Sequence, residues 1–218
     1  MPDIAAARAA ILARIGTAAK AAGRDPSDVT LVAACKTQGP EAIAAVMAAG
    51  QRVFGENRVQ EAQGRWADRP DGVELRLIGS LQSNKARDAA ALFDVIETLD
   101  RDSLARALAD AIQKDGRAPR LLAQVNTGRE PQKAGLDPRD VDGALAAWRR
   151  DYGLSVEGLM CIPPAEEPAG PHFALLARIA AGHGLGVLSM GMSGDFETAI
   201  TFGATHVRVG TALFGARA

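Results

Sequence analysis

Lysine, serine, threonine and arginine side chains stand at points where apolar runs of this sequence end. Lys36 closes the run Leu-Val-Ala-Ala-Cys-Lys, Ser193 lies in Leu-Ser-Met-Gly-Met-Ser-Gly-Asp, and Arg208 and Thr211 lie in His-Val-Arg-Val-Gly-Thr. These residue types supply an amine that can react with an aldehyde, hydroxyl groups that can bind an anion, and a permanent positive charge. Each segment therefore has a functional and a purely structural interpretation.

Lys36 has the chemistry that imine formation requires. If residues 30–36 form a strand, alternation places Lys36 on the same face as Val32 and Ala34, toward the interior of a closed barrel. Burial disfavours the ammonium form, so the pKa of Lys36 should fall and a nucleophilic amine should become available near neutral pH. The alternative is a lysine at the mouth of the strand whose ammonium group reaches water.

Small residues in the segment 188–195 indicate a turn between a strand and a helix. We predict that Ser193 caps a helix beginning near Asp195, and that backbone N–H groups of Met192–Gly194 face a phosphate at the positive end of this helix. The structural alternative is a serine-capped helix that binds no ligand.

The last strand-like run adds an arginine and a second turn. His206, Arg208 and Gly210 share one face of an alternating strand, and Gly210 with Thr211 would supply further amides. Phosphate sites after strands seven and eight recur in (β/α)₈ barrels, so Arg208 either contacts the ring of a phosphorylated ligand or forms half of an interior ion pair. An inward lysine, an anion cradle and an inward arginine match the aldehyde, phosphate and pyridine nitrogen of pyridoxal phosphate.

Short apolar runs alternate with Ala-rich amphipathic segments along most of the chain. The alternation predicts an opening helix over about residues 3–22 and then eight strand-helix units. It favours an α/β fold, a TIM-type (β/α)₈ barrel with an extra N-terminal helix, over an open doubly wound sheet, because no Gly-x-Gly-x-x-Gly turn follows the first strand. The predicted strands are Thr30–Lys36, Arg52–Gly55, Leu75–Gly79, Asp94–Thr98, Leu121–Asn126, Ser155–Ile162, Val187–Met190 and His206–Gly210. The helices predicted between them are Glu41–Ala49, Ser83–Leu92, Asp102–Lys114, Pro138–Arg150, Pro171–His183 and Phe196–Phe202.

The composition is that of a globular protein. The 218 residues are 47% hydrophobic and 23% charged, which suits a single domain over residues 1–218. A net charge of -1 without a basic block argues against a nucleic-acid partner. The first residues lack a signal peptide and no stretch reaches about eighteen uninterrupted apolar residues, so we expect a cytoplasmic protein without a membrane span. Cys35 and Cys161 lie in apolar runs and are interpreted as buried thiols rather than metal ligands or a disulfide.

Several ordered motifs resemble one known family. They are AACKT around Lys36, VFGENRVQE over 53–61, IGSLQSNK over 78–85, GLMCIP over 158–163, SMGMSGD over 189–195 and VRVGTALFGAR over 207–217. Over residues 28–217 the chain closely resembles the pyridoxal phosphate homeostasis protein family, whose fold resembles the N-terminal barrel of alanine racemase.

The resemblance implies a set of cofactor-binding residues. Lys36 would form the internal aldimine with pyridoxal 5'-phosphate, and Arg208 would meet the pyridine nitrogen. The phosphate would be held by Ser193, Gly210 and Thr211. The resemblance also places three further residues near the cofactor, namely Asn57, Ser80 and Met160. It implies no catalytic residue and no metal.

Two positions depart from the family pattern. Leu75-Arg76-Leu77 stands where the family usually carries an aromatic residue and a histidine ahead of Ile-Gly, and Arg58 stands where members often have tyrosine. The role of Arg76 is open. Lys133, in the loop 126–135, could meet a ligand anion or be a solvated loop lysine.

We favour a monomeric protein that holds pyridoxal phosphate, takes part in vitamin B6 homeostasis and supplies apo enzymes without turnover of its own. An amino-acid racemase of the alanine racemase type is the alternative. It would need a second domain and a second acid or base, yet the sequence stops at Ala218 and its single tyrosine, Tyr152, is expected at the opposite end of the barrel. A Schiff-base aldolase fits the phosphate and ring-nitrogen frame poorly, whereas a regulatory module that senses cofactor is compatible with the sequence.

Overall fold

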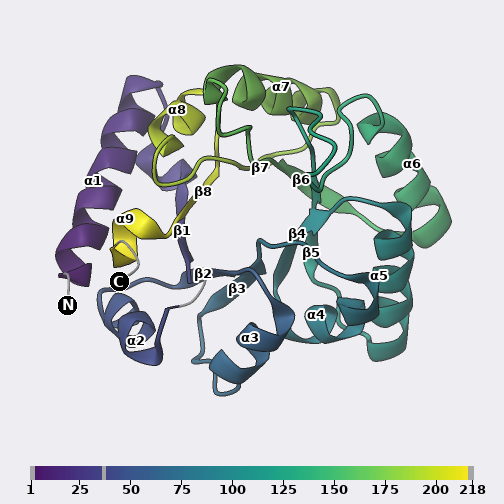
Figure 1. Ribbon diagram of the computed structural model, residues 1–218, viewed down its shortest axis with the longest axis horizontal. Helices are drawn as coiled ribbons and strands as arrows, with labels where there is room; N and C mark the ends of the chain where they lie inside the picture. The colour runs from purple at the N-terminus through teal and green to yellow at the C-terminus, as the bar shows by residue number, and fades with distance from the viewer. Residues whose placement is uncertain (1–2, 36–37, 216–218) are drawn as a thin grey trace.

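The computed structural model of the protein describes residues 3–35 and 38–215. Its eight parallel strands close into a barrel in sequence order, and β8 pairs again with β1 (Figure 1). This architecture confirms the predicted TIM-type (β/α)₈ barrel. The strands are β1 (Thr30–Ala34), β2 (Val53–Glu56), β3 (Glu74–Leu77), β4 (Val95–Leu99), β5 (Arg120–Gln124), β6 (Val156–Met160), β7 (Val187–Ser189) and β8 (His206–Val209).

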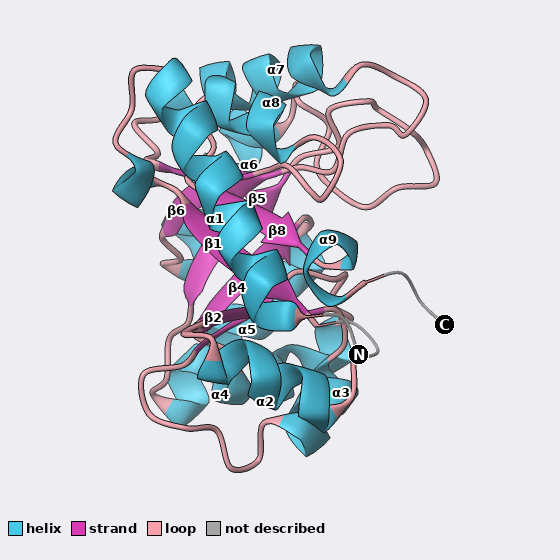
Figure 2. Ribbon diagram, turned by 90° about the vertical axis from the view of Figure 1, so that its left-hand side faces the viewer, coloured by secondary structure: helices cyan, strands magenta, loops and turns pink. Residues whose placement is uncertain are grey.

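Helices surround the barrel, as the view from the side also shows (Figure 2). The predicted extra N-terminal helix is present and lies beside the helices before and after the last strand (Figure 1). The helices are α1 (Ile4–Ala21), α2 (Pro40–Ala48), α3 (Val59–Arg65), α4 (Ala86–Leu92), α5 (Asp102–Asp115), α6 (Val141–Tyr152), α7 (Ala169–Gly182), α8 (Phe196–Thr201) and α9 (Thr211–Phe214). Short 3₁₀ helices, η1 (Pro26–Asp28) and η2 (Ser83–Lys85), precede β1 and α4.

The chain ties α1 to the barrel with side-chain hydrogen bonds. Asp3 caps the helix by accepting the N–H of Ala6 at 2.9 Å. Arg8 donates to the Gln51 side chain and to the Ala49 carbonyl. These hydrogen bonds connect α1 to the end of α2. Gln51 in turn donates to the carbonyl of Leu31 on β1 at 2.7 Å. The added helix is therefore anchored to the first strand.

Strand alternation divides the core into an outer layer and a barrel interior. Leu31 and Ala33 belong to the hydrophobic cluster that the strands share with the helices. Val32 lies beside Gly55 and opposite Arg208 in the register of the first and last strands, so it faces the interior. Lys36, whose inward direction the same alternation predicts, lies outside the described residues.

Element ends differ from the sequence prediction by a few residues. The first strand ends at Ala34 rather than at Lys36, although the N–H of Cys35 still donates to the carbonyl of Gly55 on β2. The helix predicted from Pro138 begins at Val141, because Asp137 accepts the N–H of Arg139 and holds residues 137–140 in a turn. Helices α3 and α9 were not predicted.

Two further expectations concern the membrane and the thiols. Within residues 3–35 and 38–215, no helix has the length and apolarity needed to cross a bilayer. Cys35 and Cys161 are both free and buried, as predicted. Burial raises the pKa of Cys35, and it raises that of Cys161 to about 12, so both thiols stay protonated at neutral pH.

Candidate functional site

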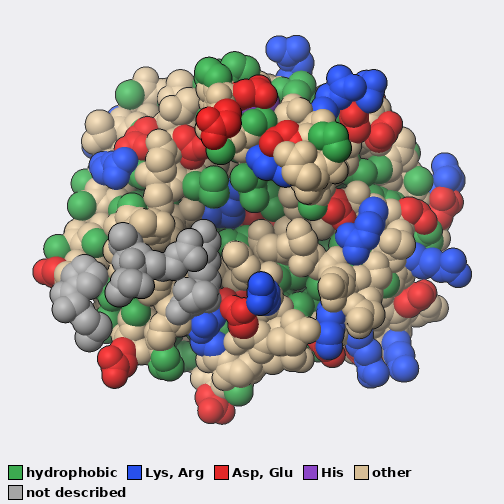
Figure 3. All heavy atoms as spheres, in the orientation of Figure 1, with side chains coloured by type: hydrophobic (Ala, Val, Ile, Leu, Met, Phe, Trp, Pro, Cys, Tyr) green, Lys and Arg blue, Asp and Glu red, His purple; other side chains and the backbone are tan. Residues whose placement is uncertain are grey.

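The carboxyl ends of the strands surround a cavity of about 450 Å³. This is the face on which barrel enzymes and binding proteins build their sites, and the volume lies within the range of roughly 300–1,000 Å³ typical of small-molecule pockets. The face as a whole carries acidic and basic side chains interspersed with hydrophobic ones (Figure 3). The lining residues are Ala34, Asn57, Ile78, Gly79, Ser80, Gln124, Ile162, Met192, Ser193, Gly194, Arg208, Gly210 and Thr211.

The turn after β7 forms one wall, and its geometry corrects the predicted cap. Ser193 does not cap α8, which begins at Phe196 with Asp195 as its N-cap residue. The Asp195 carboxylate accepts the N–H of Met192 at 2.6 Å, so that N–H is already engaged within the turn. Gly191 permits this turn because its φ is +90° and a Cβ there would lie 2.6 Å from Ala199. Of the backbone N–H groups of Met192–Gly194 that were predicted to face a phosphate, the one of Met192 is therefore already hydrogen-bonded to Asp195.

Ser193 instead connects the two loops expected to hold an anion. Its hydroxyl oxygen accepts the N–H of Ala212, in the first turn of α9, at 3.3 Å. Ser193 and Thr211 both line the cavity, as do Gly194 and Gly210 beside them. The hydroxyl groups predicted for a phosphate are thus brought together from the ends of β7 and β8.

Asn57 and Ser80 line the cavity after β2 and β3, where the two loops pack backbone to backbone. A Cβ on Gly79 would lie 2.2 Å from the carbonyl oxygen of Asn57. The glycine in the motif IGSLQSNK is therefore required by the close approach of these loops rather than by an unusual φ angle.

Arg208 forms part of the floor of the cavity and is almost completely buried. Its Nη1 donates to Ser189 Oγ at 2.7 Å, and its Nη2 donates to the carbonyl of Cys161 at 2.8 Å. Nη1 also lies 4.0 Å from a carboxylate oxygen of Glu97. Arg208 therefore lines the cavity and also takes part in an interior ion pair, while its contact with the ring of a ligand stays a prediction.

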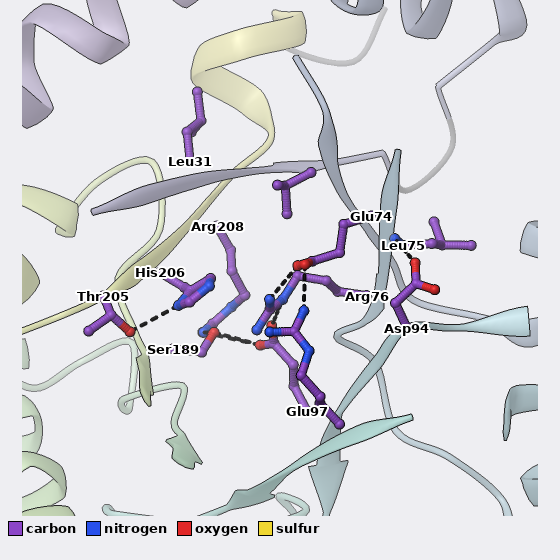
Figure 4. A network of polar contacts seen from close by, with 12 residues as sticks. Leu31, Glu74, Leu75, Arg76, Asp94, Glu97, Ser189, Thr205, His206 and Arg208 are labelled. Carbon is purple, nitrogen blue, oxygen red and sulfur yellow. Dashed lines mark hydrogen bonds and ion pairs between the residues drawn. The ribbon is translucent and has the colours of Figure 1, made fainter. Parts of the chain in front are cut away.

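Beneath Arg208 lies a network that contains Arg76, whose role was open, and Glu97, which the sequence analysis missed (Figure 4). Glu97, on β4, is fully buried and accepts Arg76 Nε and Ser189 Oγ, both at 2.5 Å. Arg76, on β3, also pairs with Glu74 at 2.6 Å. Arg76 and Glu97 each interrupt an apolar strand at an inward position, which is the signal that could have revealed them.

The network keeps Glu97 ionised. Burial alone would raise the pKa of Glu97, but the guanidinium groups of Arg76 and Arg208 and the hydrogen bonds from Ser189 and Arg76 together hold it below its usual value. Burial would likewise lower the pKa of Arg76, but the carboxylates of Glu97 and Glu74 raise it above its usual value. A carboxylate between two arginines is consequently the stable charge state of the interior.

Other residues from the sequence analysis lie away from the cavity lining. Met160 is fully buried on β6 and is not among the lining residues. Lys133 is paired with Glu130 in its own loop at 2.6 Å and donates to the carbonyl of Pro163 in the loop after β6. Tyr152, the last residue of α6, is not among the lining residues and donates to Asp102, the first residue of α5. Among the described residues, no group of three or more His, Cys, Asp and Glu side chains could hold a metal ion.

Comparison with known proteins agrees with the motifs. A protein of Pseudomonas aeruginosa named pyridoxal phosphate homeostasis protein is 44% identical over 225 residues, which cover 100% of this chain and 97% of the relative. The protein of the same name from Escherichia coli K12 is 39% identical over 231 residues, which cover 100% and 98%. This chain belongs to the pyridoxal phosphate homeostasis protein family. The family model described as alanine racemase, N-terminal domain, matches residues 7–218.

Solved structures extend the comparison to the fold. PipY of Synechococcus elongatus PCC7942, solved without PLP, superposes with a TM-score of 0.83 at 39% identity and covers 94% of this chain and 100% of its own. PipY with PLP bound superposes with a TM-score of 0.79 over the same shares. Alanine racemase from Bartonella henselae, at 21% identity and a TM-score of 0.72, covers 95% of this chain and 58% of its own, and shows that the barrel fold is shared.

His206, next to this network, gives a pH prediction. Burial, together with the positive charge of Arg76, lowers its pKa from 6.5 to about 4, even though Glu97 and Glu74 act in the opposite direction. Between these two pH values the unfolded chain binds more protons than the folded chain, so stability falls as the pH falls. The difference between the two pKa values corresponds to a change of about 3 kcal/mol at most in the free energy of unfolding.

We expect His206→Gln to lose that part of the pH dependence, measured as the free energy of unfolding in urea over a series of pH values from about 7 to about 4.5. His183→Gln is the comparison variant, because His183, at the C-cap of α7, pairs with Asp142 at 2.6 Å far from the interior network; it should keep the part of the pH dependence that comes from His206. Equal pH slopes for the wild type and His206→Gln would contradict the assignment.

Proposed function

We propose that this protein binds pyridoxal 5'-phosphate in the cavity at the carboxyl ends of the strands and serves vitamin B6 homeostasis and cofactor supply. The observation that carries the proposal is the convergence of the Ser193 and Thr211 hydroxyl groups and the Arg208 guanidinium on one cavity. Membership of the family supports it, since relatives of full length carry the homeostasis name and PipY has a structure with PLP bound.

The chemistry of the donor groups fits the cofactor. Hydroxyl groups of Ser193 and Thr211, with the backbone of Gly194 and Gly210, would bind the phosphate. Arg208 has N–H groups suited to the pyridine nitrogen, which is an acceptor. Ala34, which lines the cavity, stands two residues before Lys36, whose amine would bond covalently to the aldehyde.

Three other residues are proposed around the cofactor ring. Asn57 and Ser80 line the cavity and have polar side chains that can contact it. Met160 would act one layer further in, because it pairs in the sheet with Gln124 and Ser189, of which Gln124 lines the cavity. Bound pyridoxal phosphate would supply an aldehyde that exchanges one amine for another.

The phosphate assignment predicts a difference between two ligands. Pyridoxal phosphate should bind the wild type much more tightly than pyridoxal, because hydrogen bonds to a charged group contribute roughly 1.5–3 kcal/mol each, or about 10–150-fold in affinity. The changes Ser193→Ala and Thr211→Ala should each lower the affinity for pyridoxal phosphate by a factor in this range. The affinity for pyridoxal should change little. Fluorescence titration measures both affinities.

Ser155→Ala is the control for that titration, because Ser155 is an exposed serine just before the amino end of β6. Its affinities should equal those of the wild type. Equal affinity of the wild type for pyridoxal and its phosphate would contradict the placement of the anion site.

We further propose that the protein does not catalyse racemisation. A two-base racemase needs a second proton donor in the site, but the single tyrosine of the chain, Tyr152, is not among the residues that line the cavity and is hydrogen-bonded to Asp102. Arginine stays protonated in proteins, so Arg208 would donate to the ring nitrogen and oppose its protonation, which weakens the ring as an electron sink. What remains is exchange of the Lys36 amine for an incoming amine, which releases the cofactor.

This account predicts transfer without turnover. Protein loaded with pyridoxal phosphate should activate an apo enzyme and should show negligible exchange of the α-proton of L-alanine in heavy water. An alanine racemase is the positive control for the exchange, followed by proton NMR. Robust racemisation that is lost in Lys36→Ala would overturn the carrier proposal in favour of an enzyme.

For the molecule as a whole, we propose a single domain over residues 1–218 that works as a monomer in the cytoplasm. Its partners would be pyridoxal phosphate and the apo enzymes that receive it. The net charge of -1, without a basic block, supports the exclusion of nucleic acid from these partners.

A further inference from the structure

The interior network reaches across the barrel from one pair of strands to the opposite pair. Arg76 and Glu97 come from β3 and β4, and Ser189 and Arg208 come from β7 and β8 (Figure 4). The contacts run in series, from Arg76 Nε to Glu97 Oε1, from Ser189 Oγ to Glu97 Oε2, and from Arg208 Nη1 to Ser189 Oγ. Glu97 and Ser189 are both fully buried.

Each member of this series restricts the next. Arg76 occupies one oxygen of the Glu97 carboxylate, which leaves the other oxygen to accept the Ser189 hydroxyl. Ser189, having donated its hydroxyl proton to that bond, presents a lone pair to Arg208 Nη1. The Cys161 carbonyl fixes the other end of the guanidinium through Nη2.

Arg208 is thereby held by two of its five N–H bonds, which donate to Ser189 and Cys161, neither of them a residue that lines the cavity. Among the described residues, no further hydrogen bond involves its guanidinium, which leaves Nε–H and one N–H on each terminal nitrogen. An arginine without such constraints would pay a large rotamer entropy to hold one orientation. The network removes this cost before a ligand arrives.

We propose that Glu97 and Ser189 are positioning residues, which set the orientation of Arg208 so that its remaining N–H groups recognise the ring nitrogen of the cofactor. The inference rests on the proposed binding of pyridoxal phosphate and names the residues that make this binding selective for a nitrogen heterocycle. Neither residue lines the cavity, so both act through Arg208.

A ligand without the ring nitrogen separates positioning from a merely structural role. The probe is 1-deazapyridoxal 5'-phosphate, in which a C–H group replaces the nitrogen while the aldehyde and phosphate are kept. Ser189→Ala changes no charge and removes only the hydroxyl relay. It should lower the affinity for pyridoxal phosphate by about 3–10-fold, which is the effect of one hydrogen bond. The affinity for the deaza compound should stay unchanged.

Ser193→Ala is the matched control, because it removes a serine hydroxyl at the phosphate end of the same cavity. It should weaken both ligands by the same factor, so their affinity ratio stays at the wild-type value. Glu97→Gln should lower the ratio of the affinity for pyridoxal phosphate to the affinity for the deaza compound, as Ser189→Ala does. If that variant fails to fold, Arg76→Met/Glu97→Gln keeps the net charge of the interior and should lower the ratio in the same way.

The outcomes are distinct. A Ser189→Ala protein that keeps the wild-type ratio, by weakening both ligands equally or neither, overturns the inference. A wild type that binds the two ligands equally well also overturns it, while leaving phosphate binding intact. A wild type that binds neither ligand refutes the proposed function itself.

Discussion

The buried carboxylate of Glu97 is the interaction on which the interior of this barrel depends. Two arginines, Arg76 and Arg208, enter the interior with their guanidinium groups almost fully buried, and Glu97 lies between them. Removing one partner of a buried ion pair generally costs about 3–5 kcal/mol, because the charge left behind has no water to solvate it. The negative charge of Glu97, from the opposite strands, therefore helps to offset the cost of burying Arg208 at the floor of the cavity.

Arg208 lies between two parts of the site, the charged network in the barrel interior and the loops at the carboxyl ends of the strands. Beneath Arg208, Arg76 pairs with Glu97 and Glu74, and Ser189 links Glu97 to Arg208, so the contacts join β3 and β4 to β7 and β8 (Figure 4). Above it, the loops after β7 and β8 present hydroxyl groups, joined by the hydrogen bond from the Ala212 N–H to Ser193. A rigid floor and hydroxyl-bearing loops suit a protein that binds a small phosphorylated ring selectively.

The alternation of apolar runs and helical segments was enough to predict the barrel, because each strand and helix is a local pattern. It was also enough to bring Arg208, Gly210 and Thr211 to one place, since strand parity and the carboxyl-end rule are general. The role of Ser193 was predicted wrongly as a cap, because the nearby Asp195 competes for the turn. The pairing of Arg76 with Glu97 was missed because it depends on register between separate strands, although each is an isolated charge in an apolar run.

The covalent attachment of the cofactor is the central claim, and borohydride reduction tests it most directly. The protein is incubated with pyridoxal phosphate, reduced, digested and mapped by mass spectrometry. The account predicts one modified peptide, which contains Lys36, and no label after Lys36→Ala. A modified peptide that contains Lys85 or Lys133 and not Lys36 would contradict it.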